Sequence, residues 1–215
     1  MAIEIELKYL LSSNYKDSKI VVDNISTMLK AKNTTFTLSK MQLNNDYFDN
    51  SHLALRKMDI GLRIREFDQK YEQTIKTAGK VEGCLHQRPE YNVVIKSNHL
   101  DIRLFPKHIW PECVEVMALQ QSLRVIFKTN FFRHTWIITQ ENSIIELAFD
   151  RGEIFTSEEN EILVINELEI ELVSGDEQEL FSLANQLMEV VEIKPGKLSK
   201  AARGYALYDK RESSK

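Results

Sequence analysis

The feature that most constrains this chain is a strict alternation of charged and apolar residues in short segments. The clearest case is Ile3-Glu4-Ile5-Glu6-Leu7-Lys8, near the first residue. Successive side chains of a strand point to opposite faces, so this run puts its charges on one face and its apolar residues on the other. The alternation returns in segments 61–65, 71–76, 88–96 and 162–173. The sequence therefore predicts several antiparallel strands, each with one charged face and one apolar face.

Other segments complete an α+β pattern. Further strands are expected over 35–48, 123–127, 130–140 and 143–150, and segments 61–65 and 71–76 are expected to form a hairpin. Apolar residues at helical spacing predict a helix within 14–32.

The rest of the chain is expected to be helical. Segment 98–121 contains Pro106 and Pro111 and lacks period two, so we expect an insertion of short helical turns. C-terminal helices are expected over 174–207, where Ser174 and Glu177 match a capping box that would open the first of them. No linker-like stretch interrupts the sequence, which favours a single domain over 1–215.

Composition excludes several classes of protein. The 215 residues include 28 Lys plus Arg against 32 Asp plus Glu, a net charge of -4, whereas a general nucleic-acid-binding protein needs a basic surplus. Apolar stretches are too short to span a membrane, and the first residues lack the positive charge of a secretory signal. The two cysteines, Cys84 and Cys113, form neither a CxxC pair nor a disulfide framework. We expect a cytoplasmic protein with no nucleic-acid or membrane partner.

The charges on the polar faces are also sorted by sign. Glu167, Glu169 and Glu171 share one face of a single strand, where their negative charges are close enough to repel one another. The arrangement gains nothing unless a cation lies among them. Carboxylates without His or Cys neighbours suit Mg²⁺ or Mn²⁺. Paired Arg63 and Arg65 suit the oxygens of a phosphate. Two interpretations stay open: a sheet with one solvated face, or a closed barrel of about eight strands with the charges inside.

Several other phosphate and hydrolase chemistries are excluded. The sequence contains no GxxxxGK[ST] loop, no GxGxxG and no GxSxG, the motifs of P-loop, dinucleotide-binding and serine-hydrolase sites. The five histidines are scattered without the spacing of metal ligands, and we expect them to be surface or packing residues.

The motifs, taken in order, resemble the CYTH superfamily, the triphosphate tunnel metalloenzymes. Glu4-x-Glu6-x-Lys8 matches the N-terminal ExExK signature of that family. The later pieces follow across nearly the whole chain: Gly61-Leu62-Arg63-Ile64-Arg65, Thr74-Ile75-Lys76, Arg88-Pro89-Glu90, Leu147-Ala148-Phe149-Asp150, Glu167-Leu168-Glu169-Ile170-Glu171 and Lys197-Leu198-Ser199-Lys200-Ala201-Ala202-Arg203. Within the superfamily, Leu85-His86-Gln87-Arg88-Pro89-Glu90-Tyr91-Asn92 looks most like the bacterial inorganic triphosphatases. Many of these carry a C-terminal helical CHAD domain, which we do not expect in a chain that ends at Lys215.

The resemblance implies an eight-stranded antiparallel β-barrel, the triphosphate tunnel, with flanking helices outside. It implies that a set of cationic side chains binds the polyanion: Lys8, Arg63, Arg65, Lys76, Arg88, Arg133, Lys200 and Arg203. It implies metal binding by carboxylates, with one ion at Glu4, Glu6, Glu169 and Glu171, a second that activates water at Glu90 and Asp150, and Glu146 and Glu167 as further candidates. Glu90, Asp150, Lys76 and Arg133 would be catalytic.

The activity implied is hydrolysis of inorganic triphosphate, or another polyphosphate, to pyrophosphate and phosphate with Mg²⁺ or Mn²⁺, with two ions expected. Within the same superfamily, a thiamine triphosphatase or a class IV adenylyl cyclase is the alternative. These need a surface that recognises a ring, for which Phe67, Tyr71 and Trp136 are the candidates. A non-catalytic polyphosphate- or nucleotide-binding module is a third possibility, and the presence of both Glu90 and Asp150 argues against it.

Overall fold

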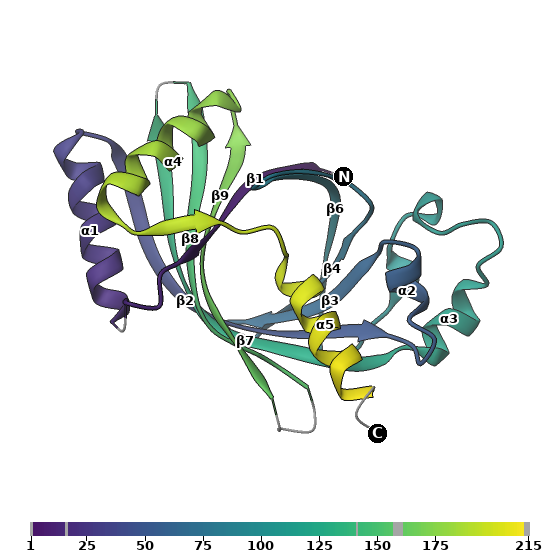
Figure 1. Ribbon diagram of the computed structural model, residues 1–215. Coiled ribbons are helices and arrows are strands. Elements are labelled where there is room, and N and C mark those ends of the chain that lie inside the picture. Colours follow the sequence, from purple (N-terminus) through teal and green to yellow (C-terminus); the bar gives the residue numbers. More distant parts are fainter. Residues whose placement is uncertain (1, 16, 141, 157–160, 213–215) are drawn as a thin grey trace.

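A computed structural model describes residues 2–15, 17–140, 142–156 and 161–212. Eight antiparallel strands form a closed barrel in the order β1-β9-β8-β7-β2-β3-β4-β6, and β6 pairs with β1 to complete the ring (Figure 1). The strands are β1 (Ala2–Leu11), β2 (Thr35–Asp49), β3 (Gly61–Phe67), β4 (Lys70–Lys76), β6 (Leu85–Ile95), β7 (Arg124–Gln140), β8 (Ser143–Phe155) and β9 (Ile162–Ser174). Two short strands, β5 (Lys80–Glu82) and β10 (Ile193–Pro195), pair with β6 and β1. The predicted eight-stranded barrel is confirmed.

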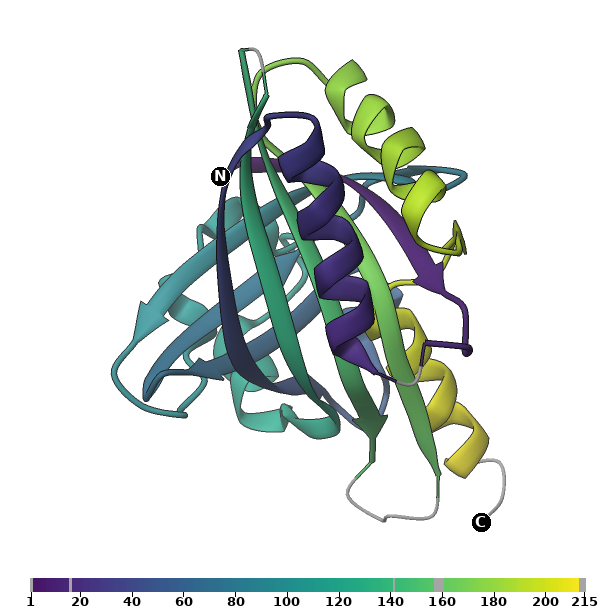
Figure 2. The same cartoon turned by 90° about the vertical axis from the view of Figure 1, so that its left-hand side faces the viewer.

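The apolar faces of the strands point outward and are covered by helices. Helices α1 (Ser18–Ala31) and α4 (Gln178–Val190) lie over the long strands (Figure 2). There Ile25 of α1 and Leu183 of α4 pack into one buried cluster with Leu147 of β8 and Leu168 of β9. Burying one such side chain stabilises the fold by about 1.5–3 kcal/mol.

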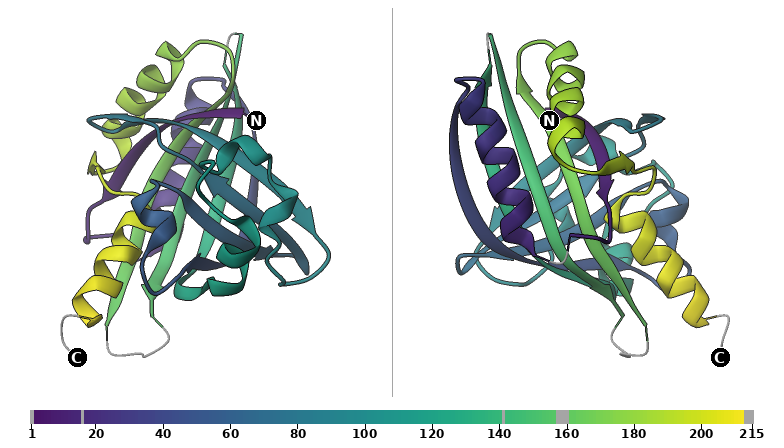
Figure 3. Two further views of the ribbon diagram at one scale, coloured as in Figure 1. Left: turned by 90° about the vertical axis from the view of Figure 1, so that its right-hand side faces the viewer. Right: turned by 60° about the vertical axis from the view of Figure 1, so that its left-hand side comes forward.

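A second layer covers the outer faces of β3, β4 and β6. It contains α2 (Ala54–Lys57), α3 (Val116–Ser122) and two 3-10 helices, Ile102–Leu104 and Lys107–Ile109 (Figure 3). Leu62, Ile75 and Tyr91 of the strands pack there against Phe105 and Trp110. Both layers leave the inner faces around the central cavity to polar side chains. No helix among the described residues is long and apolar enough to cross a membrane.

The last helix, α5 (Lys200–Glu212), lies against one end of the barrel (Figure 1). Tyr205 and Tyr208 of α5 join an aromatic cluster with Phe127 and Phe131 of β7 and Tyr47 of β2. This cluster fills that end of the barrel interior.

Two details of the sequence-based prediction are wrong. The segments 123–127 and 130–140 are not separate strands, because β7 runs unbroken from Arg124 to Gln140 and buries Thr129. Ser174 is not a helix N-cap but the last residue of β9, and α4 begins at Gln178, whose N–H bonds to Asp176. The physical reason is Gly175, which has a positive φ of 108° and lies against Ser143 of β8, so the chain turns there before the helix begins.

Candidate active site

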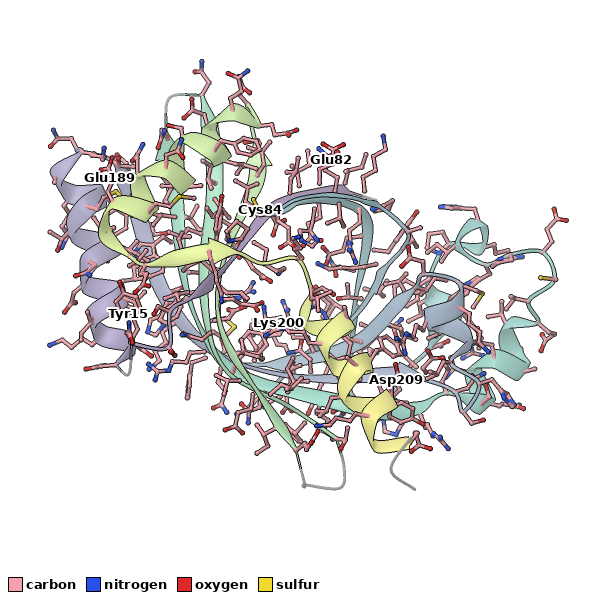
Figure 4. All side chains as sticks on the ribbon, viewed as in Figure 1. Tyr15, Glu82, Cys84, Glu189, Lys200 and Asp209 are labelled. Carbon is pink, nitrogen blue, oxygen red and sulfur yellow. The ribbon has the colours of Figure 1, made fainter. Side chains whose placement is uncertain are left out.

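A cavity of about 270 Å³ lies inside the barrel and is lined almost wholly by polar and charged side chains. They come from all eight barrel strands and from the segment that opens α5. Figure 4 shows Lys200 at the barrel opening among side chains that point inward. The charged lining residues are Glu4, Glu6, Lys8, Arg63, Arg65, Glu72, Lys76, Arg88, Glu90, Arg133, Glu146, Glu169, Glu171 and Lys200.

Strand register explains why these charges gather. Glu171 of β9 lies opposite Glu6 of β1 on one side and opposite Glu146 of β8 on the other. Directly opposite residues of antiparallel strands have Cβ atoms about 4.5–5.5 Å apart. The alternation within each strand then selects the face, so the carboxylates of three strands meet on the inner wall.

Negative charge is in excess along this wall. Burial raises the pKa of Glu171 to about 8, and the charges of Glu4 and Glu146 add to the shift. Burial also raises the pKa of Glu4, although the ammonium group of Lys76 lies 2.5 Å from Glu4 Oε1 and opposes the shift. Glu4, Glu6, Glu146 and Glu171 are named here the acidic wall, and a cation there would relieve their repulsion.

Positive charge is in excess on the β3 and β6 side. Burial lowers the pKa of Arg65 to about 10, and the nearby charges of Arg63 and Arg133 add to that shift. The Nε of Arg65 donates to Asn45 Oδ1 at 2.9 Å, but among the described residues neither Arg65 nor Arg88 has a carboxylate within 4.0 Å. Arg63 lies 3.8 Å from Glu90 and its buried Nε has no hydrogen-bond partner in the described part of the chain. We call Arg63, Arg65 and Arg88 the arginine wall.

A third group of charges is compensated internally. The carboxylates of Asp150, Glu167 and Glu169 supply oxygens within 4.8 Å of one another. Lys200 of α5 is bonded to all three, with its Nζ 2.6 Å from Asp150 and 2.9 Å from Glu169. Although burial opposes the shift, Arg133 and Lys200 hold the pKa of Asp150 below its ordinary value.

Further pairs close this network. Arg133 binds both oxygens of Asp150 at 2.7 Å, Lys8 is bonded to Glu169, and Arg203 is bonded to Glu167. These partners fix α5 to the inner faces of β7, β8 and β9.

The structure brings most of the expected site residues to the cavity, but it separates some that were expected together. Glu90 pairs with Lys76 at 3.4 Å and with Arg63, whereas Asp150 pairs with Arg133 and Lys200, so the two carboxylates belong to different groups. Asp150 and Glu167 are fully buried beneath Lys200 and do not line the cavity, and neither does Arg203.

Sequence reasoning missed several lining residues. Glu72 and Thr74 share the inward face of Lys76 on β4, so the alternation itself could have found them. Tyr47 also lines the cavity. No signal indicated it, because its strand carries no run of alternating charges.

The candidate rings for substrate recognition are not in the cavity lining. Trp136 is fully buried on the outer side of the barrel, where its Nε1 donates to Ser26 of α1 at 3.1 Å. Phe67 packs at the aromatic cluster near α5, and the Tyr71 hydroxyl donates to Glu66 at 3.4 Å. Tyr47 is the aromatic residue found in the lining.

Comparison with known proteins agrees with this geometry. The chain is 37% identical over 180 residues to an inorganic triphosphatase of Haemophilus influenzae, an alignment that covers 84% of the chain and 50% of that relative. The chain thus spans about half the length of the curated relative it matches.

Solved structures share the fold at low sequence identity. A Hippeastrum protein described as having a dominant triphosphatase activity superposes with a TM-score of 0.64 at 18% identity, over 94% of this chain and 95% of that one. The capping enzyme triphosphatase of Mimivirus gives a TM-score of 0.53 at 13% identity, over 89% and 90%. The model of the CYTH domain matches residues 2–205. The chain therefore belongs to the CYTH domain family.

Proposed function

We propose that this protein hydrolyses inorganic triphosphate to pyrophosphate and phosphate inside the barrel, with Mg²⁺ or Mn²⁺. The observation that carries the proposal is that both walls lie in one cavity and that each keeps charges without an ionic partner within 4.0 Å among the described residues. These are Glu171 on the acidic wall and Arg65 and Arg88 on the arginine wall. The acidic wall needs a cation, and the arginine wall needs an anion. A metal complex of a short polyphosphate satisfies both needs at once.

The arginine wall suits phosphate in particular. Each guanidinium group offers a planar fork of donors that matches two phosphate oxygens. The buried Nε of Arg63 lacks an acceptor among the residues that the structure describes, and a bound anion would supply one. Lys76 and Arg133 would neutralise charge on the transferred phosphoryl group from the two sides of the cavity.

The acidic wall suits a hard divalent ion. Its donors are carboxylate oxygens without sulfur or imidazole, the ligand set that Mg²⁺ and Mn²⁺ prefer. A bound ion would polarise phosphoryl oxygens and lower the pKa of water. The proposed second ion at Glu90 and Asp150 requires Lys200 and Arg133 to move off Asp150.

Glu90 is the residue that we propose as the acceptor of the proton from the attacking water. Although burial opposes the shift, Lys76 and Arg63 lower the pKa of Glu90, so the carboxylate is ionised at neutral pH. An ionised carboxylate within the cavity can orient a water molecule and take its proton.

Several observations favour inorganic triphosphate over substrates that carry a ring. The relative at 37% identity is named for that activity. One face of the Tyr47 ring stacks on Phe127 with ring centres 4.5 Å apart, and Tyr47 is only 6% exposed, so it offers little surface to a thiamine or adenine ring. Both cysteines are free thiols, which supports our placement of the protein in the reducing cytoplasm.

Phosphate release from a substrate panel tests the proposal. Triphosphate, ATP, thiamine triphosphate and long polyphosphate would be incubated with the protein and Mg²⁺ or Mn²⁺, and cyclic AMP would be measured alongside. We expect triphosphate to give the highest kcat/KM and EDTA to abolish turnover. Faster turnover of thiamine triphosphate, or formation of cyclic AMP, would replace the proposal with an alternative. No hydrolysis of any substrate would favour a binding module.

A further inference from the structure

Two residues anchor the C-terminal half of α5 away from the cavity lining: Asp49, the last residue of β2, and Arg56 of α2. The hydroxyl of Tyr205 donates to Asp49 Oδ2 at 2.8 Å, and both residues are buried. Asp49 also accepts the backbone N–H groups of Leu55 and Arg56 at 2.9 and 3.0 Å, so it is itself fixed to α2. The Arg56 guanidinium lies 5.0 Å from the centre of the Tyr205 ring and pairs with Asp209 of α5 at 2.7 Å.

The first turn of α5 meets the charged network of the barrel. Lys200 is five residues before Tyr205, a separation of about 7.5 Å along a helix axis. Gly204 lies between these two residues and lets the helix pack closely on Phe127, because a Cβ on this residue would lie 2.2 Å from the Phe127 ring. A rigid helix that is fixed at Tyr205 has a fixed depth and rotation at Lys200.

We propose that Tyr205 and Asp49 are positioning residues for substrate binding: their hydrogen bond sets the depth at which α5 holds Lys200 in the tunnel. This inference rests on the proposed function, in which Lys200 binds triphosphate. Neither residue lines the cavity, and the hydroxyl of Tyr205 that bonds to Asp49 belongs to α5. The bond persists over a wide pH range, because burial and the Asp49 carboxylate raise the pKa of Tyr205 and keep its hydroxyl a donor.

The test compares Tyr205→Phe with Lys200→Ala in steady-state hydrolysis of triphosphate. Tyr205→Phe removes one hydroxyl and keeps the buried ring. We expect it to raise KM about three- to tenfold while kcat stays within about twofold of wild type, because a positioning defect of Lys200 weakens binding. In the double variant, KM should equal that of Lys200→Ala alone, since residues that act through one another are not additive.

Two further variants make the outcome decisive. Tyr91→Phe removes a comparable hydroxyl, bonded to His108 at 3.1 Å on the outer face of β6, and should leave KM unchanged. Arg56→Gln removes the guanidinium that packs on the Tyr205 ring and pairs with Asp209, and Arg56 is more exposed than Tyr205. We expect this variant to raise KM by a smaller factor, and it serves as the test if Tyr205→Phe folds poorly. A KM within twofold of wild type in both Tyr205→Phe and Arg56→Gln would overturn the inference. So would additive effects on KM in the double variant of Tyr205→Phe and Lys200→Ala. Wild-type hydrolysis in the same assay tests the proposed function separately.

Discussion

At the scale of single residues, Arg65 shows how the proposed anion site carries a cost to folding. Its charge is buried beside two other guanidinium groups, and in the described part of the chain no carboxylate lies within 4.0 Å of it. We expect Arg65→Ala to raise KM for triphosphate about tenfold to a hundredfold, because a hydrogen bond to a charged group contributes about 1.5–3 kcal/mol. The melting temperature of the ligand-free protein should stay equal or rise, since a repelled buried charge is removed.

The matched control for that change is Arg103→Ala, which removes a guanidinium whose partner is Asp101 in an exposed pair. Its kinetics should match wild type. Equal KM values for the two variants would show that Arg65 is a solvated side chain that does not bind triphosphate.

Glu171 predicts how the metal-free protein responds to pH. The unfolded chain releases this proton near pH 4.5, whereas the folded state holds it to about pH 8. Between these values the folded state binds more protons, so stability should fall as pH rises from 5 to 8. Melting temperatures in EDTA would show the fall.

Two comparisons isolate this group from other titrations. Glu171→Gln should remove most of the fall, and Mg²⁺ should raise the wild-type melting temperature more at pH 8 than at pH 5, because the ion binds the deprotonated carboxylate. A wild-type profile that is parallel to that of Glu171→Gln would contradict the burial of an uncompensated carboxylate.

At the scale of elements, helix propensity and side-chain packing have opposite effects on stability at Gly204 of α5. Alanine at an ordinary helical glycine stabilises a helix by roughly 0.5–1 kcal/mol. At Gly204, however, the added Cβ would lie 2.2 Å from Phe127, a fully buried ring stacked on Tyr47. Overpacking of this kind costs about 1–3 kcal/mol, so we expect Gly204→Ala to lower the free energy of unfolding.

Urea denaturation with Asn185→Ala as the control measures the balance. Asn185 is exposed on α4, so its replacement should be neutral or slightly stabilising. A net gain in stability from Gly204→Ala would mean that α5 is seated less tightly than this contact requires.

The elements also show what sequence can predict. Period-two alternation predicted the strands and the inward face of each charged residue, because a strand has only two faces. It could not predict the split between Asp150 and Glu90, which depends on where Lys200 of α5 comes to rest far away in the sequence. The capping box at Ser174 failed because the match ignored Gly175, whose close approach to Ser143 holds the chain in a turn.

At the scale of the whole molecule, the closed barrel predicts a specific response to polyanions. The arginine wall crowds cations whose repulsion opposes folding. A ligand bound only by the folded state stabilises it by about 2.7 kcal/mol at a hundredfold excess over Kd. Triphosphate with Ca²⁺, chosen to support binding with little turnover, should raise the melting temperature by several degrees. Pyrophosphate should do less, because it reaches fewer cations.

The comparison that decides this prediction is sodium chloride at matched ionic strength. Screening alone would act equally through both salts. Equal shifts from triphosphate and from sodium chloride would therefore contradict a built anion site inside the barrel.

The placement of the apolar faces has a consequence for how such a protein can change over generations. The two outer layers that stabilise the fold share few side chains with the cavity, so selection on catalysis and selection on folding act on different residues. Under the proposed function, a mutation of a lining residue such as Arg88 or Glu72 would alter what the tunnel accepts without emptying a hydrophobic core. Such an architecture can acquire new substrates by ordinary point mutation while its scaffold persists.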